Sequence, residues 1–156
     1  MKNLLELDSV DRKLLNVLQD NCQLSMAEMA ERAQVSVPTC HRRLQRLRSS
    51  GLIEREAAIL DLARTSKPVA ILVDITLERH DAATHAAFEK KMLQTPEVAW
   101  CYNTSGQTDY VVIMNVADVA EYHRLATQIF SADSSVRTFR STIAIKRVKF
   151  DSRVRL

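Results

Sequence analysis

The sequence predicts an α+β protein, in which a helical domain is followed by a domain of βαββαβ order. Over residues 8–51, apolar residues recur at helical spacing in three short segments, and capping residues mark where the segments begin. From residue 69 onward, runs rich in β-branched residues alternate with helical patterns, which is the order of a ferredoxin-like, split βαβ domain. The chain has 156 residues, of which 46% are hydrophobic, so it is long and apolar enough for a proper core.

The first two predicted helices are short. Apolar residues recur at helical spacing over 8–19, and Asp8 and Asp11 place negative charge at the positive end of that helix. Ser25–Glu28 has the pattern of a capping box, so a second helix begins there and runs to about residue 33. Only two residues then separate this helix from the next capping residue.

The third predicted helix, over 36–51, is basic and marked at both ends. Ser36 can cap it, Pro38 lies in the first turn, and Gly51 can take the left-handed conformation that ends a helix. Its four arginines give a local charge of +4, against a net charge of +3 for the whole chain. One side forms an apolar stripe that should face a core, made by Val37, Cys40, Leu44 and Leu47.

Two short helices joined by a tight turn, with the second one basic, form a helix-turn-helix pattern. In that motif the second helix enters the major groove of DNA and reads bases from its N-terminal half. We expect the base readers to be Thr39, Arg42 and either His41 or Arg43, with later arginines, including Arg55, on phosphates. The full predicted set of DNA-binding residues, which we expect to face outward, is Ser36, Pro38, Thr39, His41, Arg42, Arg43, Arg46 and Arg48. The alternative is a solvated amphipathic helix without a nucleic-acid partner.

The second domain follows a break at Thr65–Pro68. Its elements are predicted as strands over 69–77, 98–104, 110–116 and 136–150 and helices over 81–93 and 117–130, the latter with Val119, Tyr122, Leu125, Ala126 and Ile129 inward. Residues 53–62 are either a strand or an extended connector. The resulting domain boundaries are 1–52 for the helix-turn-helix domain, 53–67 for the linker, 68–150 for the ferredoxin-like domain and 151–156 for a C-terminal tail.

The chain has only two glycines, Gly51 and Gly106, and we expect each to occupy a position that would strain another residue. Gly106 lies in the predicted hairpin loop 104–109, where a left-handed position is common. Three widely spaced cysteines, Cys22, Cys40 and Cys101, indicate reduced thiols and no zinc site.

The remaining composition limits the function classes. No apolar run reaches the length that spans a bilayer, and residues 1–6 are too short and polar for a signal peptide, so we expect a cytoplasmic protein that does not enter membranes. His80 and His85 are five residues apart and form no metal-ligand spacing with the cysteines. We therefore assign no catalytic residue, no metal and no cofactor.

The sequence resembles the leucine-responsive/asparagine regulator (Lrp/AsnC) family of transcription factors over nearly its whole length. The residues that carry the resemblance are Leu7-Asp8-x-x-Asp11-Arg12-Lys13-Leu14-Leu15, Ser36-x-Pro38-Thr39, Arg43-x-x-Arg46-Leu47 and Gly51-Leu52-Ile53. One departure is Gln34, which stands where the turn of the family usually has glycine.

The resemblance implies an effector site, because loop 104–109 matches the loop with which the family binds a small molecule, usually an amino acid. Backbone N–H groups near Gly106 suit the carboxylate of such a ligand, and Asp109 suits either its ammonium or a cap on its own loop. Val119, Ile143 and Ala144 line a side-chain pocket or belong to the core. The implied effector-binding set is Thr104, Ser105, Gly106, Gln107, Thr108, Asp109, Val119, Thr142, Ile143 and Ala144.

The resemblance also implies partners. Family members pair through the linker and through the open face of the sheet, and their dimers assemble to a tetramer or octamer with the effector between dimers. The implied function is a DNA-binding regulator whose assembly responds to an amino acid, and not an enzyme. Two alternatives stay open: a sirohaem decarboxylase, which some relatives of the family have become, and an accessory protein that co-assembles with a DNA-binding relative.

Overall fold

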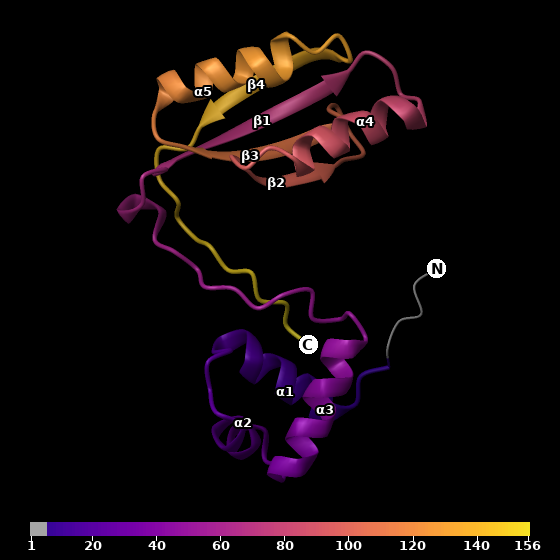
Figure 1. Ribbon diagram of the computed structural model, residues 1–156, viewed down its shortest axis with the longest axis vertical. Coiled ribbons are helices and arrows are strands. Elements are labelled where there is room, and N and C mark those ends of the chain that lie inside the picture. Colours follow the sequence, from indigo (N-terminus) through magenta and orange to yellow (C-terminus); the bar gives the residue numbers. More distant parts are fainter. Residues whose placement is uncertain (1–5) are drawn as a thin grey trace. The chain divides into compact units, whose positions relative to one another are not determined.

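The structure, a computed structural model, describes residues 6–156, so residues 1–5, on which the signal-peptide expectation partly rests, lie outside it. The chain divides into two compact units, one formed by residues up to 58 together with 149–156 and the other by 59–148. Figure 1 shows three helices in the first unit and a four-stranded sheet with helices in the second. Over the described residues, no helix combines the length and the apolarity needed to cross a membrane.

The first unit is built from helices α1 (Ser9–Asp20), α2 (Met26–Ala33) and α3 (Val37–Ser49). Asp8 caps α1 and Ser25 caps α2, each with a reciprocal bond from the third helical residue, which confirms the predicted capping box of α2. Each helix buries one apolar stripe, because residues three and four apart share a face. The common core contains Leu14, Leu18, Met29, Ala30, Ala33, Cys40 and Leu44.

The one departure from the family pattern, Gln34, lies in the turn between α2 and α3. Gln34 has φ 58° and ψ 49°, the left-handed conformation in which a helix commonly ends and which glycine adopts without strain. The backbone is nevertheless well bonded there, since the N–H groups of Gln34 and Val35 reach the carbonyls of Glu31 and Ala30. The turn therefore keeps its geometry with a residue that fits it less well.

The C-terminal segment belongs to the first unit. The side chain of Gln19 on α1 bonds both backbone groups of Val154, at 2.9 and 2.7 Å. Arg153 forms an ion pair of 2.6 Å with Asp20 at the end of α1. Residues 151–156, predicted only as a C-terminal tail, therefore dock on α1.

The second unit is an antiparallel sheet of β1 (Val69–Leu77), β2 (Val98–Asn103), β3 (Tyr110–Val116) and β4 (Val136–Ile143), in the spatial order β2-β3-β1-β4. Helix α4 (Ala82–Leu93) connects β1 to β2, and α5 (Val119–Ala126), continued by a π-helical turn over Thr127–Ser131, connects β3 to β4. This is the predicted βαββαβ fold.

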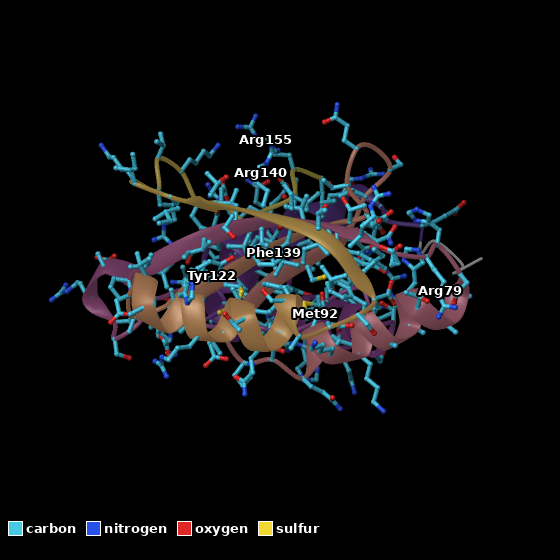
Figure 2. The ribbon with its side chains drawn as sticks, turned by 90° about the horizontal axis from the view of Figure 1, so that it is seen from above. Arg79, Met92, Tyr122, Phe139, Arg140 and Arg155 are labelled. Atoms are coloured by element: carbon cyan, nitrogen blue, oxygen red, sulfur yellow. The ribbon has the colours of Figure 1, made fainter. Side chains whose placement is uncertain are left out.

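One face of the sheet carries both helices, and the other face is open. Alternate residues of β1 and β3 are fully buried against Phe88 and Met92 of α4 and Tyr122 of α5. Figure 2 shows Met92, Tyr122 and Phe139 between the sheet and the helices, and Arg140 on the opposite side. Trp100 and Tyr102 of β2 stack at 6.1 Å between ring centroids and are 40% and 52% exposed.

Two expectations about elements are corrected, and the alternative left open for residues 53–62 is decided. Strand β4 ends at Ile143 and does not extend to residue 150, because its partner β1 begins at Val69 and its ladder closes with a bond from Ala144 N to Ala70 O. Of the two alternatives for residues 53–62, the extended connector is the one observed, since no strand among residues 6–156 pairs with 53–61 and a short 3-10 turn follows at Leu62–Arg64. Gly106 has no left-handed φ, in contrast to Gly51 with φ 75°.

Candidate DNA-binding and effector sites

The N-terminal half of α3 presents an exposed surface. Ser36 accepts a bond from Thr39 N, as predicted, and its hydroxyl also donates to the Thr39 hydroxyl at 2.9 Å. His41 and Arg42 are exposed one turn further on. Val37 is 45% exposed, so its predicted place in the core is wrong; as the first helical residue it lies beyond the reach of α2. Cys40, Leu44 and Leu47, by contrast, are fully buried as predicted.

The four arginines of α3 are not equivalent. Among residues 6–156, Arg42 has no ion-pair partner and is exposed. Arg43 instead turns toward α1, where its Nη1 lies 2.5 Å from Asp8 and 2.9 Å from Asp11, and its side chain is only 20% exposed. The expectation that Arg43 faces outward is therefore wrong.

Arg46 and Arg48 are also engaged within the chain, but they remain accessible. Arg46 donates from Nη2 to Asp11 at 2.5 Å and keeps 47% of its side chain exposed. Arg48 pairs with Glu56 at 2.8 Å and is 44% exposed. The outward charge of α3 is therefore smaller than the sequence suggested, and Arg42 is its least encumbered arginine.

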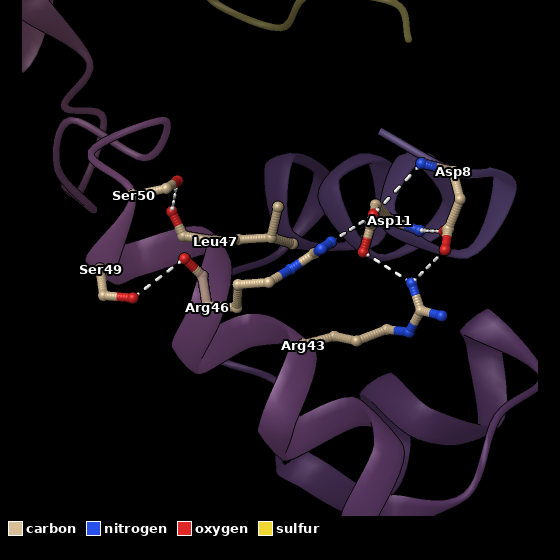
Figure 3. A network of polar contacts seen from close by, with 7 residues as sticks. All are labelled: Asp8, Asp11, Arg43, Arg46, Leu47, Ser49 and Ser50. Atoms are coloured by element: carbon tan, nitrogen blue, oxygen red, sulfur yellow. Dashed lines mark hydrogen bonds and ion pairs between the residues drawn. The ribbon is translucent and has the colours of Figure 1, made fainter. Parts of the chain in front are cut away.

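The acidic partners on α1 are held as carboxylates. Hydrogen bonds from Arg43 and from the backbone N–H of Asp11 lower the pKa of Asp8 to about 2. Burial raises the pKa of Asp11, whose side chain is 1% exposed, but the bonds from Arg43 and Arg46 outweigh burial and the pKa lies below its usual value. Figure 3 shows the Asp11 carboxylate between the guanidinium groups of Arg43 and Arg46, with the Asp8 carboxylate beside Arg43 alone.

The hairpin loop 104–109 joins β2 to β3 at one end of the sheet. Thr104 closes it with bonds from its N–H to Asp109 O at 2.8 Å and from its hydroxyl to Thr108 O at 2.7 Å. Ser105, Gly106 and Gln107 are exposed at the tip. A Cβ added at Gly106 would meet nothing within 4 Å, so the backbone there is open to a ligand.

Asp109 has a structural task in this unit. Its carboxylate accepts the N–H of Leu77 at 2.7 Å, at the end of β1, and lies 3.2 Å from His80 Nδ1. Its side chain is 18% exposed. The sequence left open a cap on its own loop or a role toward an ammonium group; the carboxylate instead bonds the end of β1, and the role toward an ammonium group stays a prediction.

The other predicted effector residues lie at the opposite end of the sheet. Thr142 and Ile143 pair with Leu72 and Ile71 near the beginning of β1, whereas the loop meets its end at Ile75 and Leu77. Five residues of strand separate the two sets, which corresponds to about 17 Å. One chain therefore does not bring the loop together with this second set.

Two members of that second set are exposed apolar residues. Val119 is 52% exposed at the beginning of α5, and Ile143 is 47% exposed at the end of β4. The expectation that Val119 points inward is therefore wrong, and neither residue belongs to the core. Their exposure excludes the core alternative for these two residues, and their role in lining a side-chain pocket stays a prediction; Ala144 is half-buried.

A polar network lies beside the loop. The Tyr110 hydroxyl donates to Glu89 at 2.9 Å, so His85 Nδ1, 2.7 Å from the same oxygen, supplies the proton of that second bond. Burial chiefly raises the pKa of Tyr110, to about 12. The rings of His80 and His85 are 6.4 Å apart, and within the described chain no three metal-ligating side chains are grouped to hold an ion.

Sequence reasoning missed three features of these sites. Asp8 and Asp11 were seen only as helix-dipole charges, although their spacing of three from each other and their match to a family motif marked them. Val37 was assigned to the core from periodicity, although its place next to the cap was a sign of exposure. Glu56 gave no signal, because its partner Arg48 is reached only through the turn that follows α3.

Comparison with known proteins places both units. A profile described as winged helix-turn-helix DNA-binding matches residues 7–54, and the Lrp/AsnC ligand binding domain matches residues 70–154. The Bkd operon transcriptional regulator of Pseudomonas aeruginosa is 31% identical over 147 residues, which cover 94% of this chain and 96% of that protein.

Two solved structures are similar over nearly the whole chain. An AsnC family transcriptional regulator from Agrobacterium tumefaciens superimposes with a TM-score of 0.88 at 28% identity, covering 95% of this chain and 96% of that one. A transcriptional regulator from Neisseria meningitidis, in complex with L-methionine, gives a TM-score of 0.87 at 26% identity, with 94% and 95% covered.

The fold, the exposed basic helix α3 and the two family models that match the chain together define a DNA-binding transcriptional regulator with a separate ligand-binding domain. The chain belongs to the Lrp/AsnC family. The matched relatives named here are transcriptional regulators and not decarboxylases, so the protein is assigned to the regulators of this family and not to its enzymatic relatives.

Proposed function

We propose that this protein binds operator DNA through α3 as paired copies and that an amino acid tunes its assembly and its DNA binding. Residues 1–52 are the DNA-binding domain, 53–67 the linker and 68–150 the effector and oligomerisation domain, with 151–156 as a tail. The protein acts in the cytoplasm, where its DNA and its effector are found.

The proposal for DNA rests on the exposed N-terminal half of α3. Arg42 is exposed without an ion-pair partner in residues 6–156, and a free guanidinium fork can bond O6 and N7 of guanine. Thr39 and His41 flank it, while Ser36 and Pro38 bring the beginning of the helix close to the DNA backbone. Arg46 and Arg48 contact phosphates, and Arg43 acts indirectly through α1.

The proposal for the effector rests on the separation of the two predicted sets along β1. A ligand that touches both the loop 104–109 and the Val119–Ile143 end needs more than one chain, which supports a site between subunits. The loop offers open backbone N–H groups near Gly106 to a carboxylate, and Asp109 a negative charge to an ammonium. The complex of the Neisseria relative with L-methionine supports an amino acid as the ligand class.

The proposal for assembly rests on the open face of the sheet. Leu72 of β1 and Trp100 and Tyr102 of β2 are exposed by 38%, 40% and 52%. Leu72 and Trp100 both pair with Ile113 of the intervening β3, so these large side chains form one apolar row across three strands of the open face. A second copy of the chain packed on this face gives a dimer, and the effector site then joins dimers into a tetramer or octamer.

Two measurements on the purified protein test the proposal. A gel shift with operator fragments selected from random duplexes should show specific binding without any other protein; no binding would favour the accessory alternative. A thermal-shift screen of the twenty amino acids should raise the melting temperature with one or a few of them, because a ligand that binds only the native state stabilises it. Uniform melting with all twenty, together with unchanged sedimentation, would contradict the effector role.

A further inference from the structure

The acidic motif at the beginning of α1 has a function that DNA binding by α3 does not yet account for. Asp8 and Asp11 cap each other: Asp8 Oδ1 accepts Asp11 N at 2.9 Å, and Asp11 Oδ2 accepts Asp8 N at 3.2 Å. A capping box alone needs only one oxygen of each carboxylate. The remaining acceptor capacity of both carboxylates is directed at α3.

Two arginines one turn apart on α3 fill that capacity. Arg43 donates to both Asp8 and Asp11, and Arg46 donates to Asp11 at 2.5 Å (Figure 3). Asp11 is 1% exposed and so uses both oxygens inside the protein. A buried carboxylate with two guanidinium partners is fully compensated, and the charged bonds fix the distance and rotation of α3 relative to α1.

Arg46 differs from Arg43 in what it leaves free. It is held by one nitrogen, Nη2, while Nε and Nη1 have no partner in the part of the chain that the structure describes, and 47% of the side chain is exposed. A guanidinium that is held through one nitrogen and has further donors free is pre-oriented to bond the oxygens of a phosphate. An unrestrained arginine would lose its rotamer freedom on meeting DNA, and this loss lowers affinity.

We propose that Asp11, supported by Asp8, is a positioning residue for DNA binding: it holds Arg46 so that the open edge of the guanidinium faces a DNA phosphate. Arg43 completes the link by tying both carboxylates to α3. The proposal rests on the function proposed above, that α3 contacts DNA.

The proposal predicts a change in DNA affinity opposite in direction to the change that simple electrostatics predicts. Replacing Asp11 by Asn removes a negative charge from the DNA-binding unit, and this change alone favours binding to a polyanion. If Asp11 positions Arg46, however, Asp11→Asn weakens binding, by about tenfold if one charge-assisted hydrogen bond is lost. Shielding of Arg46 by Asp11 would give the opposite result, tighter binding.

The experiment measures operator affinity by fluorescence anisotropy at a series of salt concentrations, with the full-length protein. Asp20→Asn is the matched control, because it also removes one paired carboxylate from α1, at the end bound to Arg153. We expect Asp11→Asn to bind more weakly than wild type, Asp20→Asn to bind at least as tightly, and Arg46→Ala to reduce the salt slope by about one. In the Arg46→Ala background, Asp11→Asn should no longer weaken binding, because only the favourable loss of a negative charge remains.

The proposal is overturned if Asp11→Asn tightens binding as Asp20→Asn does, or if it costs the same affinity with and without Arg46. Circular dichroism checks that each variant folds. Should Asp11→Asn unfold, Arg46→Lys answers the question, because lysine keeps the charge but has no second edge: unchanged affinity would exclude positioning, and a loss equal to that of Arg46→Ala would support it. If the wild-type protein showed no preference among DNA duplexes, the proposed function itself would be refuted.

Discussion

Arg42 shows how the surroundings of a side chain, and not its charge, determine what it can contact. Four arginines lie within seven positions of α3. Arg43 forms ion pairs with the beginning of α1, whereas Arg46 and Arg48 form ion pairs and remain partly exposed. Exposed and free of ion pairs in residues 6–156, Arg42 retains all its donors for a base edge.

Replacing Arg42 by Ala should therefore relax the base preference at one operator position, by about 1–3 kcal/mol. Binding-site selection from random duplexes measures this directly. Arg124→Ala, which removes an exposed arginine from α5, serves as the control and should leave the selected sequence unchanged. Identical sequence preferences in wild type and Arg42→Ala would remove Arg42 from the base readers.

Gln34 provides a stability prediction at the same scale. A non-glycine residue in the left-handed region is strained, so Gln34→Gly should raise stability by up to about 1 kcal/mol despite the greater freedom of glycine in the unfolded chain. Gln34→Val should lower it, because a branched Cβ fits the left-handed region worse. Thermal unfolding followed by circular dichroism compares the three proteins; a lower melting temperature for Gln34→Gly would show that the 3.4 Å contact with Lys13 outweighs the strain.

The helical period predicts which residues of α3 are buried, and Cys40, Leu44 and Leu47 are indeed fully buried. The partners of its arginines could not, since Asp11 is 32 residues from Arg43 and no local pattern specifies such a pair. The same holds for Asp109, whose bond to Leu77 spans 32 residues. Sequence period determines which side of an element is apolar, but long-range polar contacts depend on how the elements dock.

At the scale of elements, the junction of α1 and α3 makes stability depend on acid. Asp8 has a pKa of about 2 in the folded chain against 3.8 as its usual value, and the pKa of Asp11 is also lowered, so the unfolded chain binds their protons first as pH falls. The stabilisation is complete above about pH 4 and is lost between there and about pH 2.

We therefore expect the melting temperature of the wild type to fall between about pH 4 and pH 2 by more than that of Asp8→Asn, whose side chain does not titrate. Circular dichroism melts over this range measure both curves. Asp11 shares Arg43 and the capping bonds with Asp8, so the difference between the two curves reports on this linked pair, while the carboxylates elsewhere contribute to both proteins. Parallel curves for the two proteins would indicate that the Arg43 contact contributes nothing to folding in solution.

The loop between β2 and β3 gives the second prediction at this scale. Asp109→Asn keeps an oxygen that can accept the N–H of Leu77, so the end of β1 should remain intact, while the charge offered to an ammonium is lost. We expect the melting-temperature shift caused by the amino-acid effector to shrink or vanish. Asp133→Asn, another partly buried carboxylate of the same unit with a lysine partner, is the matched control and should keep the shift. If Asp109→Asn kept the full melting-temperature shift with the effector, the carboxylate would have only its structural role at the end of β1.

Element ends were harder to predict than elements. Strands β1 and β3 have their predicted limits, because their apolar runs are bounded by turn residues. The sequence after Ile143 remains β-compatible, and only the length of β1 ends the ladder. The backbone conformation of Gly106 likewise depends on the whole loop. The loop closes through the bonds of Thr104, so no left-handed residue is needed at Gly106.

At the scale of the whole molecule, the separation of the two effector sets along β1 implies a site shared by different chains. The loop with Asp109 lies at one end of the strand, and Val119 and Ile143 lie at the other, about 17 Å away. If one ligand contacts both sets, as proposed above, we expect each site of an oligomer to take its loop from one subunit and its apolar residues from another.

Such a site should show complementation between two inactive variants. Asp109→Asn and Val119→Asp each alter one half of every site, so neither homo-oligomer should respond to the effector. In mixed oligomers, formed by co-expression with two different affinity tags and purified through both, some sites combine the intact loop of one chain with the intact Val119 of another. These sites should restore part of the effector-induced change in sedimentation, whereas mixtures of two Asp109→Asn chains should not. A site confined to one chain predicts no restoration in any mixture, because every chain would carry one damaged half.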